Sequence, residues 1–306
     1  MAASKSQRNL EGQPPEWDEV SRQRSVRRIL FWILWANLLL VGVKVAVGWV
    51  IGSLSVLGDA AHSGTDALNN VIALTAVYFA AAPPDEEHPY GHGKFETLGA
   101  FVIAGFLSIT CFELLRSAAL RLIQGAPPPR PDLMAVLILA GTMAVNIWIA
   151  YYERRRGKEL RSELLTADAQ HTQADVWVTA AVLIGLGLVH IGVGQADAVL
   201  AVIVAIVVAH SGYQILRRTV PVLVDRRAVD SSSVYEVASN VEGVESVTAI
   251  RSRGRPGEGF AELTVRVHPA IQVRQAHMIA DEVERRVASE LELKNVVVHV
   301  EPSELH

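Results

Sequence analysis

Two eight-residue segments of this 306-residue chain share one arrangement of acidic residues around a histidine. They read DAAHSGTD at 59–66 and DAQHTQAD at 168–175, and each lies beside a long apolar stretch. Helix positions three, four and seven residues apart face the same side, so each segment turns its histidine and aspartates to one face. The histidine and the last aspartate of each segment can then bind one ion together. The candidate ligands are His62, Asp66, His171 and Asp175.

Two imidazoles and two carboxylates from facing helices would form a four-coordinate site with nitrogen and oxygen donors. Such a site suits Zn²⁺, and Co²⁺, Cd²⁺, Ni²⁺, Fe²⁺ and Mn²⁺ also accept these donors. Mg²⁺ and Ca²⁺ are disfavoured because they prefer oxygen shells. Ionisable residues within a membrane are costly and mark ion pathways, so we expect the four residues to bind a transported cation. The alternative is that they only form hydrogen bonds between helices.

The first aspartate of each segment, Asp59 or Asp168, lies about 10 Å along the helix axis from the last one, too far to share its metal. If the two helices face each other in opposite directions, one of these carboxylates lies on each side of the four ligands. Each could attract cations in a vestibule, or could be a hydrogen-bonded residue near a helix end.

A third group of metal-ligand residues lies between two apolar segments, in DEEHPYGHGKFE at 85–96. Asp85, His88 and His92 are three and four residues apart, and the Pro-Tyr-Gly insert precludes a simple helix. A loop of this kind can supply three ligands to one ion from a short segment. The alternative is a solvated loop whose histidines form local hydrogen bonds.

Half of the residues are hydrophobic, and the mean hydropathy of +0.27 is too high for an ordinary soluble fold. Six segments are long enough to cross a bilayer, which takes about 20 mostly apolar residues. The second and fifth are the weakest candidates because they carry the charged motif segments. The six segments are 29–51, 53–82, 98–123, 133–152, 165–193 and 198–216.

Basic residues indicate how these segments are oriented. The connections at 125–132 and 192–198 contain one basic residue, Arg130, whereas those on the other side are rich in arginine and lysine. By the positive-inside rule, both termini and the second and fourth connections are cytoplasmic. No secretory signal peptide is visible. We therefore expect a multi-pass integral membrane protein, in a bacterial inner (plasma) membrane.

The pattern changes after Asp225. The segments 232–244, 245–253, 260–268, 273–291 and 295–301 predict, in this order, a helix, two strands, a helix and a strand. This order predicts a small cytoplasmic α+β domain with helices on one face of a sheet, like a ferredoxin or a metallochaperone. A polar N-terminal segment, a six-helix transmembrane domain and this domain then occupy residues 1–28, 29–225 and 226–306.

The two motif segments, the H-P-Y-G-H-G-K-x-E run at 88–96, the six apolar segments and the C-terminal domain together resemble the cation diffusion facilitator family. The resemblance covers the chain from about Arg28 to Pro302. It implies a homodimer, formed through the transmembrane and C-terminal domains, that exports a cytosolic divalent metal in exchange for protons. It also implies a second zinc site, facing the cytoplasm, at Asp85, His88 and His92.

The C-terminal domain departs from the metal-binding members of that family. Those members carry histidines on both central strands, where this chain has Thr248 and Thr264. The remaining candidate ligands are His277, His299 and Glu301. They could hold one ion, with a further ligand from a partner chain, or the domain could serve dimerisation alone.

Together these patterns predict a secondary active transporter that exports Zn²⁺ in exchange for protons. Only neutral imidazole binds metal, so protons compete with the ion at the membrane site. No GxxxxGK[ST] motif is present, which favours a gradient over ATP as the driving force. The small net charge of −4 indicates no nucleic-acid partner, and the single Cys111 excludes an internal disulfide. The rivals are a membrane metalloenzyme and a membrane-anchored metal sensor.

Overall fold

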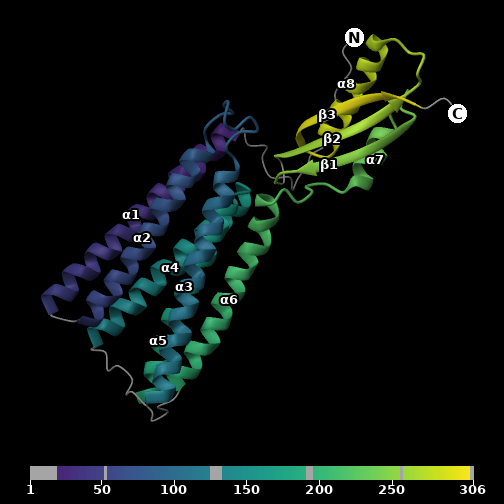
Figure 1. Cartoon of the computed structure of the whole chain (residues 1–306). Helices are drawn as coiled ribbons and strands as arrows, with labels where there is room; N and C mark the ends of the chain where they lie inside the picture. The colour runs from purple at the N-terminus through teal and green to yellow at the C-terminus, as the bar shows by residue number, and fades with distance from the viewer. Residues whose placement is uncertain (1–18, 52–53, 125–132, 191–195, 256–257, 304–306) are drawn as a thin grey trace, which may run out of the picture. The chain divides into compact units, whose positions relative to one another are not determined.

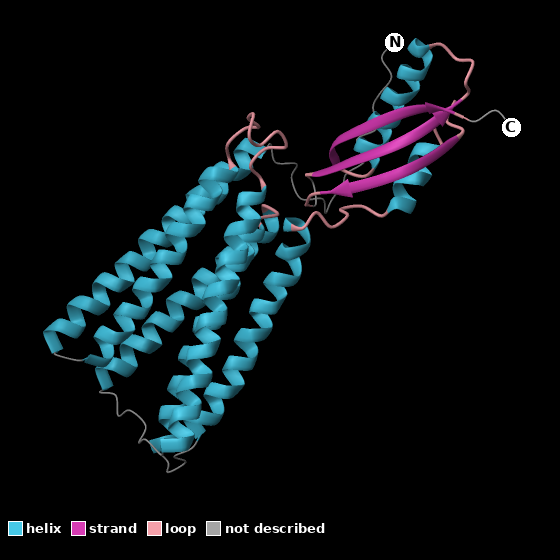
Figure 2. Ribbon diagram, viewed as in Figure 1, coloured by secondary structure: helices cyan, strands magenta, loops and turns pink. Residues whose placement is uncertain are grey.

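The computed structural model describes residues 19–51, 54–124, 133–190, 196–255 and 258–303. The chain divides into two compact units, Met1–Thr219 and Val220–His306. Figure 1 follows the chain by residue number, and Figure 2 distinguishes the helices of the first unit from the helices and strands of the second.

In the described residues of the first unit, the secondary structure is helical. The helices are α1 (Glu19–Ile51), α2 (Leu54–Ala80), α3 (Lys94–Gln124), α4 (Leu133–Glu159), α5 (Glu163–His190) and α6 (Ala196–Leu223). Helices α1 and α2 run side by side, α4 packs against α5, and α3 contacts both α2 and α5 (Figure 1). These contacts bring the two motif-bearing helices, α2 and α5, to the same third helix.

Four of these helices are long and apolar enough to cross a membrane when only the described residues are considered. The spans are Ser21–Val50, Lys94–Leu120, Leu133–Glu159 and Val199–Leu223, in α1, α3, α4 and α6. Helices α2 and α5, the two weakest candidates by sequence, do not meet the same test. The prediction of a helical membrane domain is therefore confirmed, whereas six membrane spans stay a prediction.

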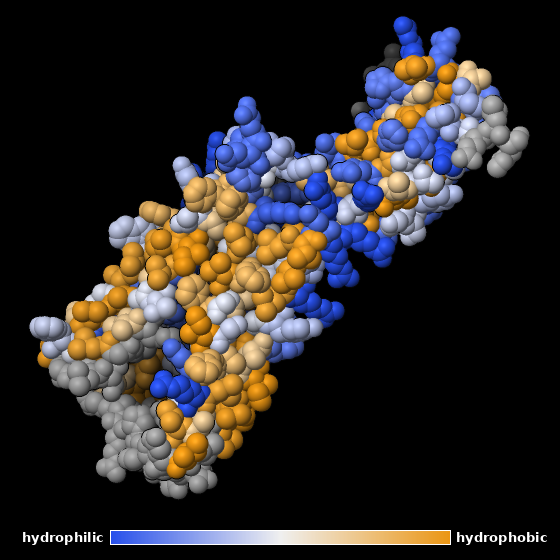
Figure 3. Space-filling view, viewed as in Figure 1, coloured by the Kyte–Doolittle hydropathy of each residue, from blue (hydrophilic) through white to orange (hydrophobic). Residues whose placement is uncertain are grey.

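The outer surface of the first unit is largely apolar, as the orange areas of Figure 3 show. Along α1, Trp32, Trp35, Leu39 and Trp49 are 67%, 55%, 70% and 80% exposed. The interior is apolar as well, with Leu30, Ile103, Leu107, Ile149 and Leu164 among its buried side chains. Helices that are apolar on all sides are typical of a membrane bundle, because lipid replaces water around them.

A buried polar cluster fixes three helices against one another at one end of the bundle. Arg22 of α1 donates to Glu96 Oε2 of α3 at 3.0 Å. Ser162, just before α5, donates to Glu96 Oε1 at 2.5 Å and accepts the backbone N–H of Leu165, so it also caps α5. Because these side chains are buried, each needs its partner, and the start of α5 is held against α3.

The backbones of α4 and α5 approach closely at Gly157. A Cβ atom at this position would lie 3.0 Å from the Thr166 backbone nitrogen and 3.2 Å from Leu165 Cβ. Glycine leaves the room that any larger residue would fill. The close approach sets the position of the α5 segment that follows, which carries the second motif.

The second unit has the predicted α+β order. Its elements are α7 (Ser231–Ser239), β1 (Ser246–Arg253), β2 (Gly259–Val267), α8 (Val273–Glu290) and β3 (Leu293–Pro302). Strand β2 lies in the middle, antiparallel to β1 and parallel to β3. Helix α7 contacts β1 and α8, and α8 contacts β3, so both helices cover one face. The core between them includes Val234, Ala238, Leu263, Val265, Val283, Val287 and Val296.

Candidate metal centre

Asp66 of α2 meets His171 and Asp175 of α5 inside the helical unit. His171 Nε2 lies 3.5 Å from Asp66 Oδ1 and 3.9 Å from Asp175 Oδ2. One donor atom of each residue lies within 4.8 Å of the others. Two ligands bound tetrahedrally to an ion at about 2.0–2.2 Å are about 3.4 Å apart. The three side chains, called the membrane cluster below, could therefore close around one ion with small shifts.

Burial strengthens the electrostatic interactions among the charged groups of the membrane cluster. His171 and Asp175 are 4% and 7% exposed, and the Asp66 side chain is 20% exposed. Two carboxylates that share a poorly solvated space repel each other with little screening. A divalent cation between them would relieve this repulsion by balancing their negative charge.

Asn69, one helical turn after Asp66, also contacts the imidazole ring of the membrane cluster. Asn69 Nδ2 lies 2.9 Å from His171 Nε2, and both side chains are buried. If the amide donates, the Nε2 lone pair faces α2, and Nδ1 carries the ring proton. His171 Nδ1 has no hydrogen-bond partner within the described part of the chain. Asn69 thus holds Nε2 toward α2, and an ion bound at this nitrogen would have to displace the Asn69 amide.

Asp59 and His62 belong to α2, but their side chains lie outside the described residues. The helix is continuous through both positions, so His62 keeps its spacing of one turn from Asp66. Its role as a fourth ligand stays a prediction, as does the vestibule role of Asp59.

Asp168 is buried beside Glu153 of α4, with exposed fractions of 2% and 0%. Glu153 Oε2 accepts from Thr172 Oγ1 at 3.3 Å, whereas Glu153 Oε1 and Asp168 Oδ2 have no hydrogen-bond partner within the described part of the chain. Both acids interact electrostatically with the membrane cluster, Asp168 with Asp66 and Glu153 with Asp175. The acidic interior therefore extends from α2 and α5 to α4.

Asp85, His88 and His92 form a second group, called the loop cluster below, between α2 and α3. Asp85 Oδ1 lies 3.3 Å from His88 Nδ1, and Asp85 Oδ2 lies 3.4 Å from His92 Nε2. One donor atom of each residue again lies within 4.8 Å of the others. The loop thus brings together all three of its candidate ligands.

Short-range hydrogen bonds orient the loop cluster. His92 Nδ1 lies 3.1 Å from the Pro83 carbonyl oxygen, so Nδ1 donates and Nε2 is left facing Asp85. The backbone N–H of His88 donates to Asp85 Oδ1 at 2.6 Å. This bond is the main reason that the pKa of the Asp85 carboxyl lies below its ordinary value. The loop therefore offers an ionised carboxylate between two imidazoles.

The candidate ligands of the C-terminal domain pair separately. His277 Nδ1 lies 3.6 Å from Asp281 Oδ1 on α8, and His299 Nε2 lies 3.6 Å from Glu301 Oε1 on β3. Among the described residues, no cluster of three metal-ligand atoms joins His277 to His299 and Glu301. Metal binding by this domain stays a prediction. One row across the sheet consists of Thr248, Thr264 and His299.

Two of the polar residues around the membrane cluster, Asn69 and Glu153, were not predicted from the sequence to lie near it. Asn69 shares a helix face with Asp66, a weak signal because asparagine is common in helices. Glu153 directly precedes an arginine run and was expected to lie just beyond the apolar segment at 133–152. Only the packing of α4 on α5 shows that it is buried.

Comparisons with known proteins cover almost all of the chain. The family model described as a cation efflux transmembrane domain matches residues 30–224, and the model of a cation efflux protein cytoplasmic domain matches residues 227–303. The uncharacterized transporter MJ0449 of Methanocaldococcus jannaschii is 32% identical, over 91% of this chain and 99% of its own. The cation-efflux pump FieF of Cronobacter sakazakii is 28% identical, over 87% and 89%. The manganese efflux system protein MneS of Bacillus subtilis is 26% identical, over 88% and 93%.

Proposed function

The chain belongs to the cation diffusion facilitator family, and on this premise we propose that it exports Zn²⁺ in exchange for protons. It is an integral membrane protein of a family of divalent cation transporters, which leaves the metalloenzyme and the sensor without support. The proposed ion-binding site consists of His62, Asp66, His171 and Asp175.

The observation that carries the proposal is the buried contact of Asp66 on α2 with His171 and Asp175 on α5. An ion bound there would be held by two helices at once. A change in the spacing or tilt of α2 relative to α5 would therefore change the affinity, as alternating access requires. A site on a single helix would lack this coupling.

The choice of zinc follows from the ligands. Imidazole nitrogen with carboxylate oxygen suits Zn²⁺ in tetrahedral geometry, with bond lengths that agree with the donor spacing of the membrane cluster. Related proteins carry other names, among them a manganese efflux protein. The same ligand types also accept Mn²⁺, Fe²⁺, Co²⁺, Ni²⁺ and Cd²⁺, so the experiment below compares these ions.

Proton exchange follows from the same ligands. An imidazole binds metal only when it is neutral, so a proton on His171 Nε2 and an ion at the same nitrogen exclude each other. The buried carboxyl groups of Asp168 and Glu153 add negative charge near the site, and protonating them would weaken its hold on a cation. Acid on the far side of the membrane would therefore favour release of the ion.

We further propose that all six helices of the first unit span a bacterial inner membrane, with both termini in the cytoplasm. The apolar spans of α1, α3, α4 and α6 support this, and so does the position of arginine and lysine in the connections. Helices α2 and α5 can lie in the membrane despite their acidic residues, because the membrane cluster faces the inside of the bundle.

The loop cluster and the second unit supply the remaining proposals. We assign a second, cytoplasm-facing zinc site to Asp85, His88 and His92, whose donor spacing supports it. We assign homodimerisation to the membrane unit and the C-terminal domain, supported for the latter by its match to the cytoplasmic domain of cation efflux proteins. A zinc site involving His277, His299 and Glu301 would then need a ligand from the partner chain.

The test is metal flux into proteoliposomes after a pH jump. The full chain should move zinc in proportion to the proton gradient, whereas Asp66→Ala and Asp175→Ala should not. Asp85→Ala serves as the control for a general loss of metal affinity. A panel of divalent ions identifies the transported metal. Equal flux in the native chain and both membrane-cluster variants would contradict the proposed ion-binding site. Absence of flux for every ion would contradict the proposed transport function.

A further inference from the structure

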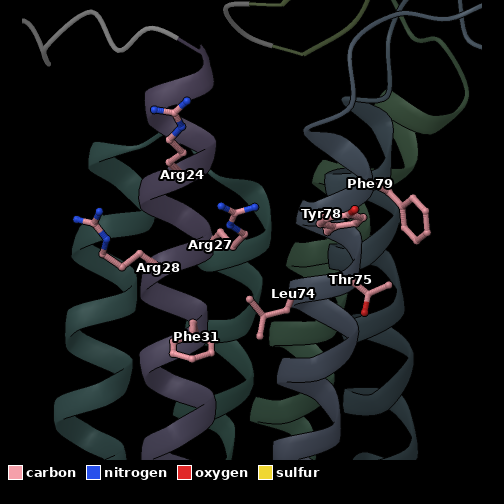
Figure 4. Close-up of a pocket in the computed structure, with 8 residues that line it drawn as sticks. All are labelled: Arg24, Arg27, Arg28, Phe31, Leu74, Thr75, Tyr78 and Phe79. Carbon is pink, nitrogen blue, oxygen red and sulfur yellow. The ribbon is translucent and has the colours of Figure 1, made fainter.

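A pocket with both charged and apolar walls lies between α1 and α2, and none of its lining residues belongs to either metal cluster. Its volume is about 580 Å³. It lies near the N-terminal end of α1 and the C-terminal end of α2 (Figure 4). The lining residues are Arg24, Arg27, Arg28 and Phe31 of α1, and Leu74, Thr75, Tyr78 and Phe79 of α2.

The charged wall carries three positive charges that have no counter-charge among the described residues. Arg24, Arg27 and Arg28 lie three and four residues apart on α1, and all three are exposed. Within the described part of the chain, none of them forms an ion pair or a hydrogen bond. Arg22, by contrast, is buried and paired with Glu96. The buried Arg22 is thus neutralised within the bundle, whereas the three exposed arginines can bind an anion from outside it.

The apolar wall continues from the arginines along the helices. Figure 4 shows Arg27 extending from α1 toward α2, with Phe31 about one turn further along and Leu74 across from them. Phe31 and Phe79 are each 48% exposed, and beyond them α1 presents the exposed Trp32 and other large apolar side chains. A free inorganic anion would make no favourable contact with these apolar side chains, whereas an acyl chain would pack along them.

We propose that this pocket binds one anionic phospholipid. The headgroup phosphate would lie among Arg24, Arg27 and Arg28, and an acyl chain would follow Phe31 and Leu74 along the α1–α2 groove. Basic pockets between membrane helices on the cytoplasmic side bind acidic headgroups in this way, and arginine forms two parallel hydrogen bonds to a phosphate. Tyr78, 65% exposed, has the amphipathic side chain that favours the level of the headgroups.

A rival occupant is the chain's own N-terminus. Residues 1–18 contain three acidic residues, Glu11, Glu16 and Asp18, and two basic ones. That segment has acidic residues that could pair with the arginines, but few apolar side chains that could cover the apolar wall. The lipid has both, which is why we assign the pocket to the lipid.

The test is native mass spectrometry of the full chain in detergent with added phosphatidylglycerol, phosphatidylcholine or inorganic phosphate. We expect one tightly bound phosphatidylglycerol per chain and weaker binding of the other two. Replacing Arg24, Arg27 and Arg28 together by glutamine should weaken phosphatidylglycerol binding by about tenfold or more. The matched control removes three exposed arginines elsewhere, with Arg154, Arg217 and Arg218 replaced by glutamine, and should change it less than about twofold.

Phe31→Ser adds a test of the apolar wall, and it should weaken phosphatidylglycerol binding without affecting inorganic phosphate. Equal losses in the two triple variants would mean that overall charge alone attracts the lipid, and would overturn the proposal. So would inorganic phosphate that binds as tightly as the lipid. If phosphatidylglycerol binds only after residues 1–18 are deleted, the N-terminus is the occupant and the proposal is wrong.

Discussion

The membrane cluster and the loop cluster use the same two ligand types in opposite surroundings. Asp66 lies on α2 and His171 on α5, and both are largely enclosed by apolar helices. In the loop cluster, Asp85 and His88 come from one short segment, and their side chains are 53% and 42% exposed. Water screens the charges of Asp85 and His88, although His92 is buried, whereas the charges of the membrane cluster depend on a bound cation or proton.

This difference separates two roles that the ligand types alone would not distinguish. Ligands from two helices make affinity depend on how those helices are arranged, so the membrane cluster can couple binding to a conformational change. Ligands from one loop stay together whatever the helices do. The loop cluster is therefore suited to holding a metal on one side, and the predictions below test this separation.

The largest expected effect comes from neutralising a ligand of the membrane cluster. Asp66→Asn or Asp175→Asn should lower zinc flux in proteoliposomes by about 100-fold or more, because even groups that only support a ligand contribute about 10–100-fold in affinity. Asp85→Asn, the same change in the loop cluster, should lower flux less than about fivefold. Similar losses in the two clusters would contradict the separation of roles.

A smaller effect is expected from the buried acid of α4. Glu153→Gln removes a carboxyl group that interacts with Asp168 and Asp175, and should weaken zinc binding to the membrane cluster by about tenfold. Glu159→Gln is the matched control, since Glu159 lies on the same helix but is paired outside the cluster with Arg155 and Arg156. Calorimetric zinc titration measures both variants. Equal affinities would show that the acidic interior ends at α5.

The double change His88→Gln with His92→Gln should remove one zinc from the metal bound per chain and reduce flux only about twofold to fivefold. The reason is that the loop cluster would supply metal to the pathway without forming part of it. Metal analysis after dialysis gives the stoichiometry, and His268→Gln, an exposed histidine of the second unit, is the control. Flux as low as that of Asp66→Asn would place the loop cluster on the pathway itself.

The smallest effect concerns pH at Asp85. Its pKa is lowered, so the charged carboxylate stabilises the turn above its ordinary pKa of about 3.9, and this contribution is lost only as pH falls through the lower folded value. Between about pH 5.5 and 7.5, zinc binding to the loop should therefore displace the same number of protons in the native chain and in Asp85→Asn, although the variant binds more weakly. Calorimetry in buffers of different ionisation enthalpy, in an Asp66→Asn background, measures this number. A loss of about one proton in the variant would contradict the assignment.

The candidate ligands could be predicted from the sequence wherever they lie close together along the chain. His171 and Asp175 lie one helical turn apart, and the three candidate ligands of the loop lie within eight residues, so both groups could be predicted from the sequence. The family resemblance is confirmed, as is the order of elements in the second unit. The partners of His171 were less accessible, because the contact of Asn69 depends on how α2 packs beside α5.

Two further features lay beyond what spacing can show. Glu153 directly precedes a basic run and Arg22 begins another, and charged residues at such positions are normally solvated. Glu153 is buried where α4 packs on α5. Arg22 is buried where it bonds to Glu96 of α3 and to the Leu160 carbonyl oxygen, and no local pattern encodes these contacts. Over the described residues, α2 and α5 lack a span as apolar as those of the other four helices, because they carry the charged and polar residues of the two motif segments.

The most direct test of the central claim is zinc binding to a chain in which both other candidate sites have been silenced. Asp85→Asn, His88→Gln and His92→Gln remove the loop cluster, and His277→Gln and His299→Gln remove the candidate ligands of the C-terminal domain. Calorimetry should find one zinc per chain that binds with release of protons and is lost on acidification. Adding Asp66→Asn should abolish this binding. Zinc that still binds with the same affinity and proton release after that change would show that α2 and α5 do not hold the ion.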